Sequence, residues 1–367
     1  MRSTKAIIHL DRLGRNIAAV RTKIGPKPLI CMPVKADAYG HGAVPVAQAA
    51  LEAGVRYLAV ATVDEGIALR EAGIGAPVLL LSIPLPEELP AVAAGDLCPL
   101  IGDREYAEAA AGAAEHAGRR LSVHLKVDTG MGRVGCPPEA VRELAAFIAA
   151  RPSLALAGTA THLAAADSPA AADVAYTGKQ LARFRAAAGE IRRAGIDPGL
   201  LHAANSGAVI FHKDAWFDMV RPGILLYGYG APERAPEVEP VMELATQVSF
   251  IKQVKAGETV SYGRTWTAPQ DTVIATLPVG YGDGLPRRLS GNWPVRIRDA
   301  LYPLVGRICM DQCMVDLGPD ADIGRWEPVT VFGGGAPNAA VLAARIGTIP
   351  YEITCGVNKR VPRVYRY

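Results

Sequence analysis

One lysine, Lys35, stands where an apolar run meets a turn rich in glycine and aspartate, in the segment CMPVKADAYGHG at positions 31–42. The run 29–34 predicts a strand, and 43–53 predicts a helix after the turn. Desolvation at such a strand tip disfavours the ammonium form. It lowers the lysine pKa from about 10.4 and leaves an amine that can attack an aldehyde. A lysine solvated at a strand end has the same local sequence, so Lys35 alone leaves both interpretations open.

The chain alternates apolar runs with helix-like stretches, and Asp11 and Asp103 can cap two of the helices. Eight runs predict buried strands: 29–35, 56–62, 77–82, 97–101, 121–127, 154–161, 200–205 and 216–221. One helix carries an apolar stripe of Leu181, Phe184, Ala188 and Ile191. Alternation predicts a parallel sheet, and the count of eight predicts an α/β fold with a closed (β/α)8 TIM-type barrel. An open doubly wound sheet is disfavoured because no G-x-G-x-x-G follows the first strand.

The pattern changes after about residue 230, where 231–240 predicts a linker rich in proline and glutamate. Only 339–345 is predicted to be helical beyond it. The β-like runs are 248–254, 259–262, 272–278, 295–298, 304–315 and 328–332. These runs predict two domains, a barrel over 11–230 and a mainly β domain over 240–367 that also takes the N-terminal strand in 1–10.

Composition excludes several classes of protein. Of the 367 residues, 50% are hydrophobic and 20% are charged, so the chain can bury a large core and disorder is not expected. The formal net charge is +3 without a basic block, so nucleic acid is not an expected partner. No signal peptide or membrane span is predicted. The six cysteines form no C-x-x-C pair, and Cys309 and Cys313 are predicted to share one strand face. This usage favours reduced thiols in the cytoplasm and no metal site.

The ends of the predicted barrel strands carry polar residues, which is where barrels place their working groups. They are Lys35, Lys126, Asp128, Arg133, His162, Asn205, Ser206 and Arg221, and Gly223 and Ile224 follow with backbone amides that can point at a phosphate. The loops after the seventh and eighth strands often bind phosphate, and the first strand closes beside the eighth. A lysine for an aldehyde next to a phosphate site predicts pyridoxal 5′-phosphate (PLP).

Eight stretches carry a resemblance that spans nearly the whole chain. They are VKADAYGHG at 34–42, KVDTGMGR at 126–133, TH at 161–162, NS at 205–206, RPGI at 221–224, SYGR at 261–264, GYGDG at 280–284 with CMD at 309–311. Together they resemble the alanine racemase family, PLP-dependent barrel enzymes. Pro222, between Arg221 and Gly223, removes one backbone donor from the predicted phosphate-binding loop, because proline has no N–H.

The resemblance implies a role for each matching residue. Lys35 would hold PLP as a Schiff base, and the remaining cofactor-binding residues would be Tyr39, His162, Asn205, Ser206, Arg221, Gly223, Ile224 and Tyr351. Arg221 would face the pyridine nitrogen and keep it unprotonated, with His162 behind it. Substrate would be bound by Arg133, Met310, Tyr281 and Asp311, with Arg133 and the Met310 amide on its carboxylate.

The resemblance also implies a two-base racemisation of alanine, with Lys35 and Tyr262 acting on opposite faces of Cα. Tyr262 would come from the other subunit of a homodimer. Its phenol is a poor base unless nearby donors or positive charge stabilise the phenolate. A lysine at the Lys126 position can be carbamylated in this family and would then orient Arg133. The implied role is the supply of D-alanine for peptidoglycan.

Other interpretations stay open at this point. Tyr262 and His162 could be ordinary packed residues, and Lys126 could form an ion pair with Asp128. A barrel-type PLP decarboxylase would need a carboxylate at the Arg221 position, and a non-catalytic PLP carrier would lack the β domain. Serine differs from alanine by one hydroxyl, so a small pocket rejects it only modestly.

Overall fold

The computed structural model describes residues 2–230 and 234–367; residues 231–233 of the predicted linker lie outside the described residues. The chain divides into two compact units. The barrel unit comprises Leu13–Ala38 and Ala43–Val238. The β unit comprises the N-terminal residues up to Arg12, Tyr39–Gly42 and Glu239–Tyr367.

The strands of the barrel unit are all parallel to their neighbours. They are β2 Leu29–Pro33, β3 Tyr57–Val60, β4 Val78–Leu80, β5 Leu100–Ile101, β6 Leu121–Lys126, β7 Leu154–Ala160, β8 Leu200–His202 and β9 Met219–Val220. Their order is β4-β3-β2-β9 and β5-β6-β7-β8. A bridge between Leu79 and Cys98 joins the two groups on one side. A hydrogen bond of 3.0 Å from the Asp218 N–H to the Leu201 carbonyl joins them on the other. The predicted eight-stranded barrel is therefore confirmed.

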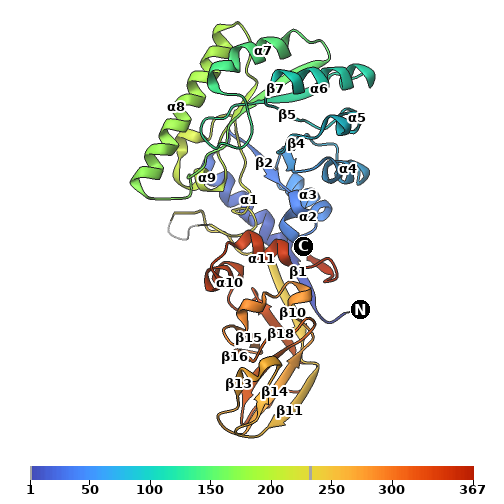
Figure 1. Ribbon diagram of the computed structural model, residues 1–367, viewed down its shortest axis with the longest axis vertical. Coiled ribbons are helices and arrows are strands. Elements are labelled where there is room, and N and C mark those ends of the chain that lie inside the picture. The colour runs from blue at the N-terminus through green and yellow to red at the C-terminus, as the bar shows by residue number, and fades with distance from the viewer. Residues whose placement is uncertain (1, 231–233) are drawn as a thin grey trace. The chain divides into compact units, whose positions relative to one another are not determined.

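Helices follow the strands, and α5 to α8 lie outside them (Figure 1). The bounds are α1 Leu10–Ile24, α2 Lys35–Gly40, α3 Ala43–Glu52, α4 Val63–Glu71, α5 Leu89–Ala94, α6 Arg104–His116, α7 Val141–Ala149, α8 Ala171–Arg193 and α9 Ser206–Phe211. Asp103 caps α6, and the predicted stripe of α8 is buried. The prediction for Asp11 is wrong, because α1 begins at Leu10 and Asp11 lies inside its first turn. Among the described helices, none combines the length and apolar character needed to cross a membrane.

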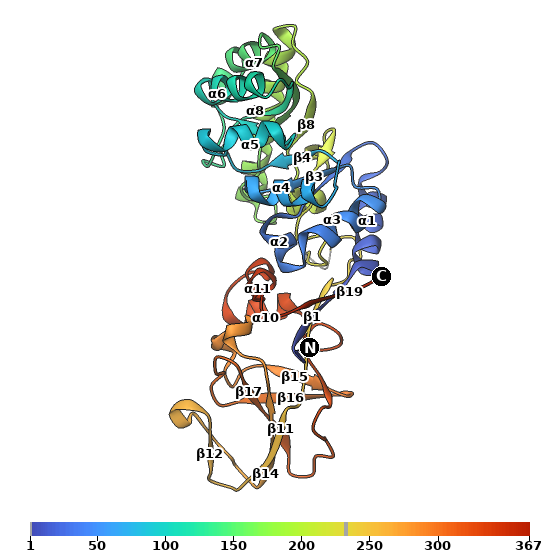
Figure 2. The same ribbon diagram turned by 90° about the vertical axis from the view of Figure 1, so that its right-hand side faces the viewer.

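The β unit is built on a nine-stranded sheet in the order β11-β14-β17-β16-β15-β18-β10-β1-β19. The bounds are β1 Lys5–His9, β10 Met242–Gln247, β11 Phe250–Val254, β14 Thr272–Leu277, β15 Pro294–Ile297, β16 Ala300–Val305, β17 Cys313–Gly318, β18 Pro328–Phe332 and β19 Arg363–Arg366. A separate hairpin pairs β12 Thr259–Val260 with β13 Trp266–Thr267. Figure 2 shows α10 Ala339–Ile346 and α11 Pro350–Gly356 side by side within this unit.

Side chains that alternate between the buried and the exposed face explain why these segments form strands. Residues of β17 are buried and part-exposed in strict turn, as expected for a sheet with one covered face. Under the hairpin, a small core contains Val254, Val260, Ala268, Ile274 and Val305. The hairpin is therefore anchored to the sheet by a packed apolar core.

Several predictions for the β unit are wrong in informative ways. The run 304–315 is two strands, β16 and β17, with a loop between them. Cys309 lies in that loop and so shares no strand face with Cys313. The predicted strand at 259–262 ends at Val260, and Tyr262 begins a short turn, Tyr262–Arg264. Helix α11 was missed, and it carries Tyr351.

Candidate active site

The backbone becomes left-handed directly after Lys35. Residues Ala36 to Tyr39 have φ angles of 52°, 53°, 54° and 52°, so the turn α2 has the opposite hand to an ordinary helix. Each such residue costs about 1–2 kcal/mol because its Cβ approaches the following carbonyl. Strain of this kind persists only where the surroundings impose it, and it clusters at functional sites. The turn predicted after the first strand is thus a strained support for Lys35.

Two carboxylates hold this turn in place. The Glu65 side chain accepts hydrogen bonds from the Ala36 N–H at 2.6 Å and from the Ala61 N–H at 2.8 Å. The Asp37 side chain accepts one from the Ala43 N–H at 2.7 Å. Glu65 therefore fixes the backbone immediately after Lys35.

Arg221 lies buried at the end of β9 and uses both terminal nitrogens of its guanidinium. Nη1 donates to His202 Nδ1 at 2.6 Å. Nη2 faces the Thr161 and Ala203 carbonyls at 2.8 and 3.2 Å, and His162 Nδ1 at 3.3 Å. The Nε–H has no acceptor among the described residues, so one donor of a firmly held guanidinium remains available. Burial lowers the pKa of Arg221 to about 10, and the group stays protonated at neutral pH.

The hydrogen bonds of Arg221 fix the tautomers of two buried histidines. Arginine has only donors, so His202 Nδ1 must accept and its proton must lie on Nε2. That nitrogen faces His124 Nδ1 at 2.8 Å, which must accept in turn. Burial, reinforced by the Arg221 charge, lowers the pKa of His124 to about 4 and that of His202 well below its ordinary value. Both rings are therefore neutral at pH 7.

Four cationic side chains act on the ring of His162. Burial is the main cause that lowers the pKa of His162 to about 3, and Arg221, Arg133, Lys126 and Lys35 lower it further. His162 is neutral and surrounded by positive charge. The structure thus brings these five predicted site residues near one another at one end of the barrel, in a setting that favours an anionic ligand.

Ser206 connects the loops that follow β8 and β9. Its buried hydroxyl accepts hydrogen bonds from the Gly223 N–H at 2.9 Å and the Leu225 N–H at 3.3 Å, which leaves its own O–H to donate. The Ile224 N–H donates to no group among the described residues. Asn205 caps α9 by accepting from the Ala208 N–H at 3.0 Å. The arrangement offers hydroxyl and amide donors, as a phosphate requires.

Lys126 and Asp128 do not form the ion pair considered above. The Asp128 carboxylate instead accepts hydrogen bonds from the amides of Gly130, Met131 and Gly132, and so shapes the loop that carries Arg133. Lys126 is buried, and its ammonium donates to the adjacent Val127 carbonyl at 3.2 Å. Burial and the Arg221 charge lower the pKa of Lys126 to about 8. A fraction of this amine is therefore neutral near pH 7.

In the β unit, Tyr262 stands on a loop with unusual backbone geometry. Ser261, Gly263 and Arg264 have φ angles of 70°, 71° and 50°. The Ser261 hydroxyl donates to the Arg307 carbonyl at 2.6 Å and lies 3.6 Å from Cys309 Sγ. The Tyr262 side chain is 70% exposed. The phenol is thus held out from the unit, beside the loop that contains Cys309.

The loop between β16 and β17 carries Met310 and Asp311 next to Tyr281. The Tyr281 N–H donates to the Cys309 carbonyl at 3.0 Å. Met310 is 54% exposed, and its N–H donates to no group among the described residues. Asp311 pairs with Arg360 at 2.8 Å. Three predicted substrate-binding residues therefore lie together in the β unit.

Tyr39 and Tyr351 also meet in the β unit. Their rings pack edge to face with centroids 5.4 Å apart. Burial raises the pKa of Tyr39, and Tyr351 raises it further, so Tyr39 keeps its proton at neutral pH. It can act as a hydrogen-bond donor and not as a base.

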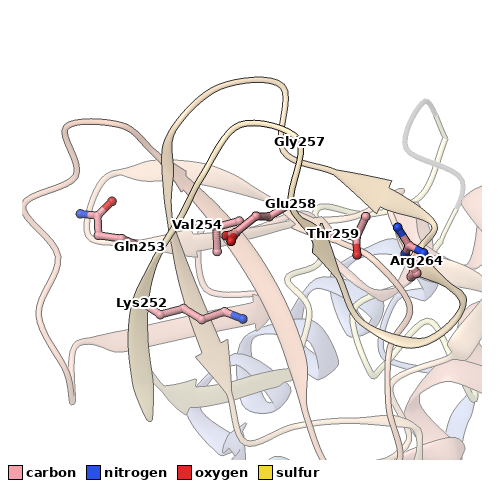
Figure 3. Close-up of a pocket in the computed structure, with 7 residues that line it drawn as sticks. All are labelled: Lys252, Gln253, Val254, Gly257, Glu258, Thr259 and Arg264. Carbon is pink, nitrogen blue, oxygen red and sulfur yellow. The ribbon is translucent and has the colours of Figure 1, made fainter.

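A surface pocket beside the hairpin β12–β13 contains none of the predicted site residues (Figure 3). Its lining residues are Lys252, Gln253, Val254, Gly257, Glu258, Thr259 and Arg264. Most of these side chains are exposed, so the pocket lacks the buried charge that distinguishes the barrel end. The geometry does not favour it as an active site.

Comparison with known proteins covers both units. Residues 8–231 match the family described as "Alanine racemase, N-terminal domain", and residues 241–365 match "Alanine racemase, C-terminal domain". The chain belongs to the alanine racemase family. An alanine racemase of Treponema denticola is 49% identical over 375 residues, covering 100% of this chain and 98% of the relative.

Solved structures of the alanine racemase family agree over the same length. The alanine racemase of Clostridium difficile 630 is 37% identical with a TM-score of 0.94, covering 100% of this chain and 96% of that one. The enzyme from Bacillus anthracis with bound L-Ala-P is 34% identical with a TM-score of 0.92, covering 100% and 96%. The family resemblance in the sequence is thus confirmed.

Sequence reasoning missed several polar residues that build the site. His124 and His202 lie inside apolar strands without a motif, and Glu65 lies on a helix far along the chain from Lys35. Asp283 was visible inside GYGDG but was given no role. A buried polar residue in an otherwise apolar strand was the only available signal for the two histidines.

Proposed function

We propose a two-base mechanism for this member of the alanine racemase family, with Lys35 and Tyr262 as the bases and PLP as the cofactor. The chain is an enzyme that interconverts L-alanine and D-alanine, as full-length likeness to enzymes of that name shows. One observation carries the mechanism: Arg221 is buried, can only donate hydrogen bonds, and is held in place by acceptors. PLP belongs to the barrel domain, 11–230, and Tyr262 to the mainly β domain, 240–367 with 1–10.

The residues at the barrel end fit PLP by their chemistry. Its phosphate is an anion that needs N–H and O–H donors, and Ser206 and the Ile224 amide offer them. Its pyridine nitrogen is an acceptor when unprotonated, and Arg221 keeps one N–H available. Lys35 would bind the aldehyde covalently. The proposed cofactor set also includes Tyr39, His162, Asn205, Gly223 and Tyr351.

Proton transfer falls to two side chains. When bound, PLP withdraws electron density from the substrate Cα and makes its proton removable. Lys35 takes or returns that proton on one face, and Tyr262 does so on the other. Two bases on opposite faces invert the centre without turning the substrate over.

Arg221 controls how strongly the cofactor withdraws charge. Its hydrogen bonds to His202 and the Thr161 carbonyl hold the guanidinium as a donor, and a guanidinium gives up no proton to the ring nitrogen. The ring is then a weaker electron sink than it is beside a carboxylate. Prompt reprotonation of Cα is favoured over side reactions.

The proposed substrate-binding residues divide two tasks, holding the carboxylate and limiting the side chain. Arg133 and the Met310 amide bind the carboxylate, Asp311 orients that group, and Tyr281 and Tyr351 restrict the side-chain space to one of alanine size. Serine is the expected competing substrate, since one added hydroxyl is discriminated weakly.

Lys126 is a proposed carbamylation site that would orient Arg133. Its lowered pKa supplies a neutral amine, which combines with CO2 to give a carbamate and release one proton. The product carries a negative charge beside Arg133. Intact-mass measurement under gentle conditions should show the mass of one added CO2, lost in a Lys126→Arg variant, and its absence from wild type would argue against the site.

The enzyme is proposed to work as a homodimer with shared active sites, because Tyr262 projects from its own unit with 70% of its surface exposed. The cysteine usage, six thiols without a C-x-x-C pair, favours a reducing cytoplasm. Supply of D-alanine for peptidoglycan is the proposed role. No nucleic acid, membrane or metal is part of the proposal.

Circular dichroism of L-alanine turnover tests the mechanism, with wild type, Tyr262→Phe and the control Tyr302→Phe. We expect Tyr262→Phe to keep the visible absorption of bound PLP and to lose about 10²–10⁴-fold in turnover, the usual contribution of a general base. Tyr302→Phe should retain activity. A wild type that binds PLP without changing the optical signal would favour a carrier or, with CO2 release, a decarboxylase.

A further inference from the structure

Asp283 is a completely buried carboxylate that the proposed mechanism does not use. One oxygen contacts Arg2 Nη1 at 2.5 Å and Arg360 Nε at 2.7 Å. The other accepts hydrogen bonds from Arg2 Nη2 at 2.9 Å and from the Gly280 N–H at 3.0 Å. A buried carboxylate is tolerated only when it is paired and hydrogen-bonded in this way.

The two arginines differ in what else they touch. Arg360 Nη2 pairs with Asp311 at 2.8 Å and faces the Met310 carbonyl at 3.4 Å. The other contact of Arg2 is the Pro278 carbonyl at 3.4 Å, outside that loop. Of the two arginines, therefore, only Arg360 connects Asp283 with Met310 and Asp311, which are proposed to lie at the substrate carboxylate.

The backbone makes the same connection independently. The Tyr281 N–H donates to the Cys309 carbonyl at 3.0 Å, and the Gly282 N–H donates to the Met310 carbonyl at 2.8 Å. A Cβ on Gly282 would lie 2.5 Å from Arg360 Nη2, so a side chain there would have to displace the guanidinium. Asp283, Arg360 and the two amides thus hold one loop, 309–311.

We propose that Asp283 and Arg360 are positioning residues that hold the loop 309–311 so that the Met310 amide faces the substrate carboxylate. The inference rests on the proposed function. Carbonyl groups of the loop are taken by the motif 280–284, while the Met310 N–H donates to no described group. Of the three loop amides, that of Cys309 donates to the Gln312 carbonyl, and those of Met310 and Asp311 have no acceptor among the described residues.

Arg360→Met and Arg2→Met form a matched pair, because each removes one arginine from Asp283 and leaves the other. We expect Arg360→Met to raise the KM for L-alanine on the order of tenfold, with a smaller change in kcat, because a substrate contact is displaced. Arg2→Met should keep the KM within about twofold. Arg360→Lys should recover part of the loss, since a single ammonium reaches only one carboxylate at a time.

Hydrogen exchange of the Tyr281 and Gly282 amides gives a readout that does not depend on turnover. Exchange should be faster in Arg360→Met than in wild type and unchanged in Arg2→Met. Equal KM values and equal exchange in the two variants would overturn the proposal and leave Asp283 as a packing residue. A wild type without racemase activity would instead contradict the proposed function, while the exchange comparison would still test the loop.

Discussion

The candidate residues fall into two groups, a barrel half and an exposed half in the β unit, and the two groups are built in opposite ways. In the barrel unit, Arg221, His202 and His124 are buried and linked by hydrogen bonds between side chains. In the β unit, Tyr262 and Met310 are 70% and 54% exposed, and their loops are held at backbone groups by neighbouring amides and by the Ser261 and Arg360 side chains. One half therefore resembles a protein core, and the other resembles an interface.

This difference separates two tasks. A buried network cannot rearrange without losing hydrogen bonds, so it suits a group that must keep one protonation state. An exposed side chain on a held backbone costs little stability and can meet a second surface. The first construction fits the proposed partner of the cofactor ring, and the second fits a base supplied to another subunit.

Replacing Arg221 by methionine should show the largest effect and the sharpest contrast. It leaves His202 Nδ1 and the Thr161 and Ala203 carbonyls without their donor, and each buried unsatisfied acceptor costs about 1–3 kcal/mol. We expect the free energy of unfolding, measured in urea, to fall by at least about 3 kcal/mol. Tyr262→Phe should change it by less than about 0.5 kcal/mol. Similar losses in both variants would contradict the contrast between the halves.

Acid should destabilise the barrel half through its neutral histidines. In the unfolded chain, histidine titrates near 6.5, whereas the folded pKa of His124 is about 4 and that of His162 about 3. Their contribution to stability is complete above pH 6.5 and is lost as the pH falls towards those folded values. From about pH 7 to about pH 5, we expect a loss on the order of 2 kcal/mol per histidine.

His124→Asn offers the matched test of this pH dependence. An asparagine oxygen can accept from His202 Nε2–H but does not titrate, so the variant should lose less stability on acidification. His116→Gln, which alters an exposed histidine at the end of α6, should behave like wild type. Identical acid profiles for wild type and His124→Asn would show that this ring does not couple folding to protons.

Periodicity predicted the barrel well because every strand in it is a short apolar run between helices. It failed where apolar residues continue through a turn. Residues 304–315 contain Ile308, Cys309 and Met310 between two strands, and only the close approach of Gly306 to the Val260 carbonyl marks the break. Helix α11 is seven residues long, too short for a clear apolar stripe.

The motifs predicted which residues form the site but not which residues hold them in place. The left-handed turn after Lys35 depends on Glu65, which lies thirty residues away along the chain; its T-x-x-E spacing from Thr62 signals a helix start but not this contact. His124 fits only because Gly158 faces it, where a Cβ would lie 2.5 Å from the ring Nδ1. Contacts of this kind arise from the closed barrel and cannot be deduced from one strand at a time.

The smallest expected effect tests how firmly the exposed half is held. A Cβ on Gly280 would lie 2.3 Å from the Cys309 carbonyl oxygen and 2.4 Å from that of Met310, so Gly280→Ala must displace the loop 309–311. We expect a loss of about 1–2 kcal/mol in the free energy of unfolding. A rise in the KM for alanine of roughly threefold should accompany it, with kcat less affected.

Gly324→Ala is the control for this substitution, because nothing lies within 4 Å of a Cβ at that position. It should change neither stability by more than about 0.5 kcal/mol nor the KM. An unchanged KM in Gly280→Ala, despite lost stability, would mean that the loop tolerates displacement. The exposed half would then owe its geometry to the surface it meets in the proposed dimer and not to the contacts within its own unit.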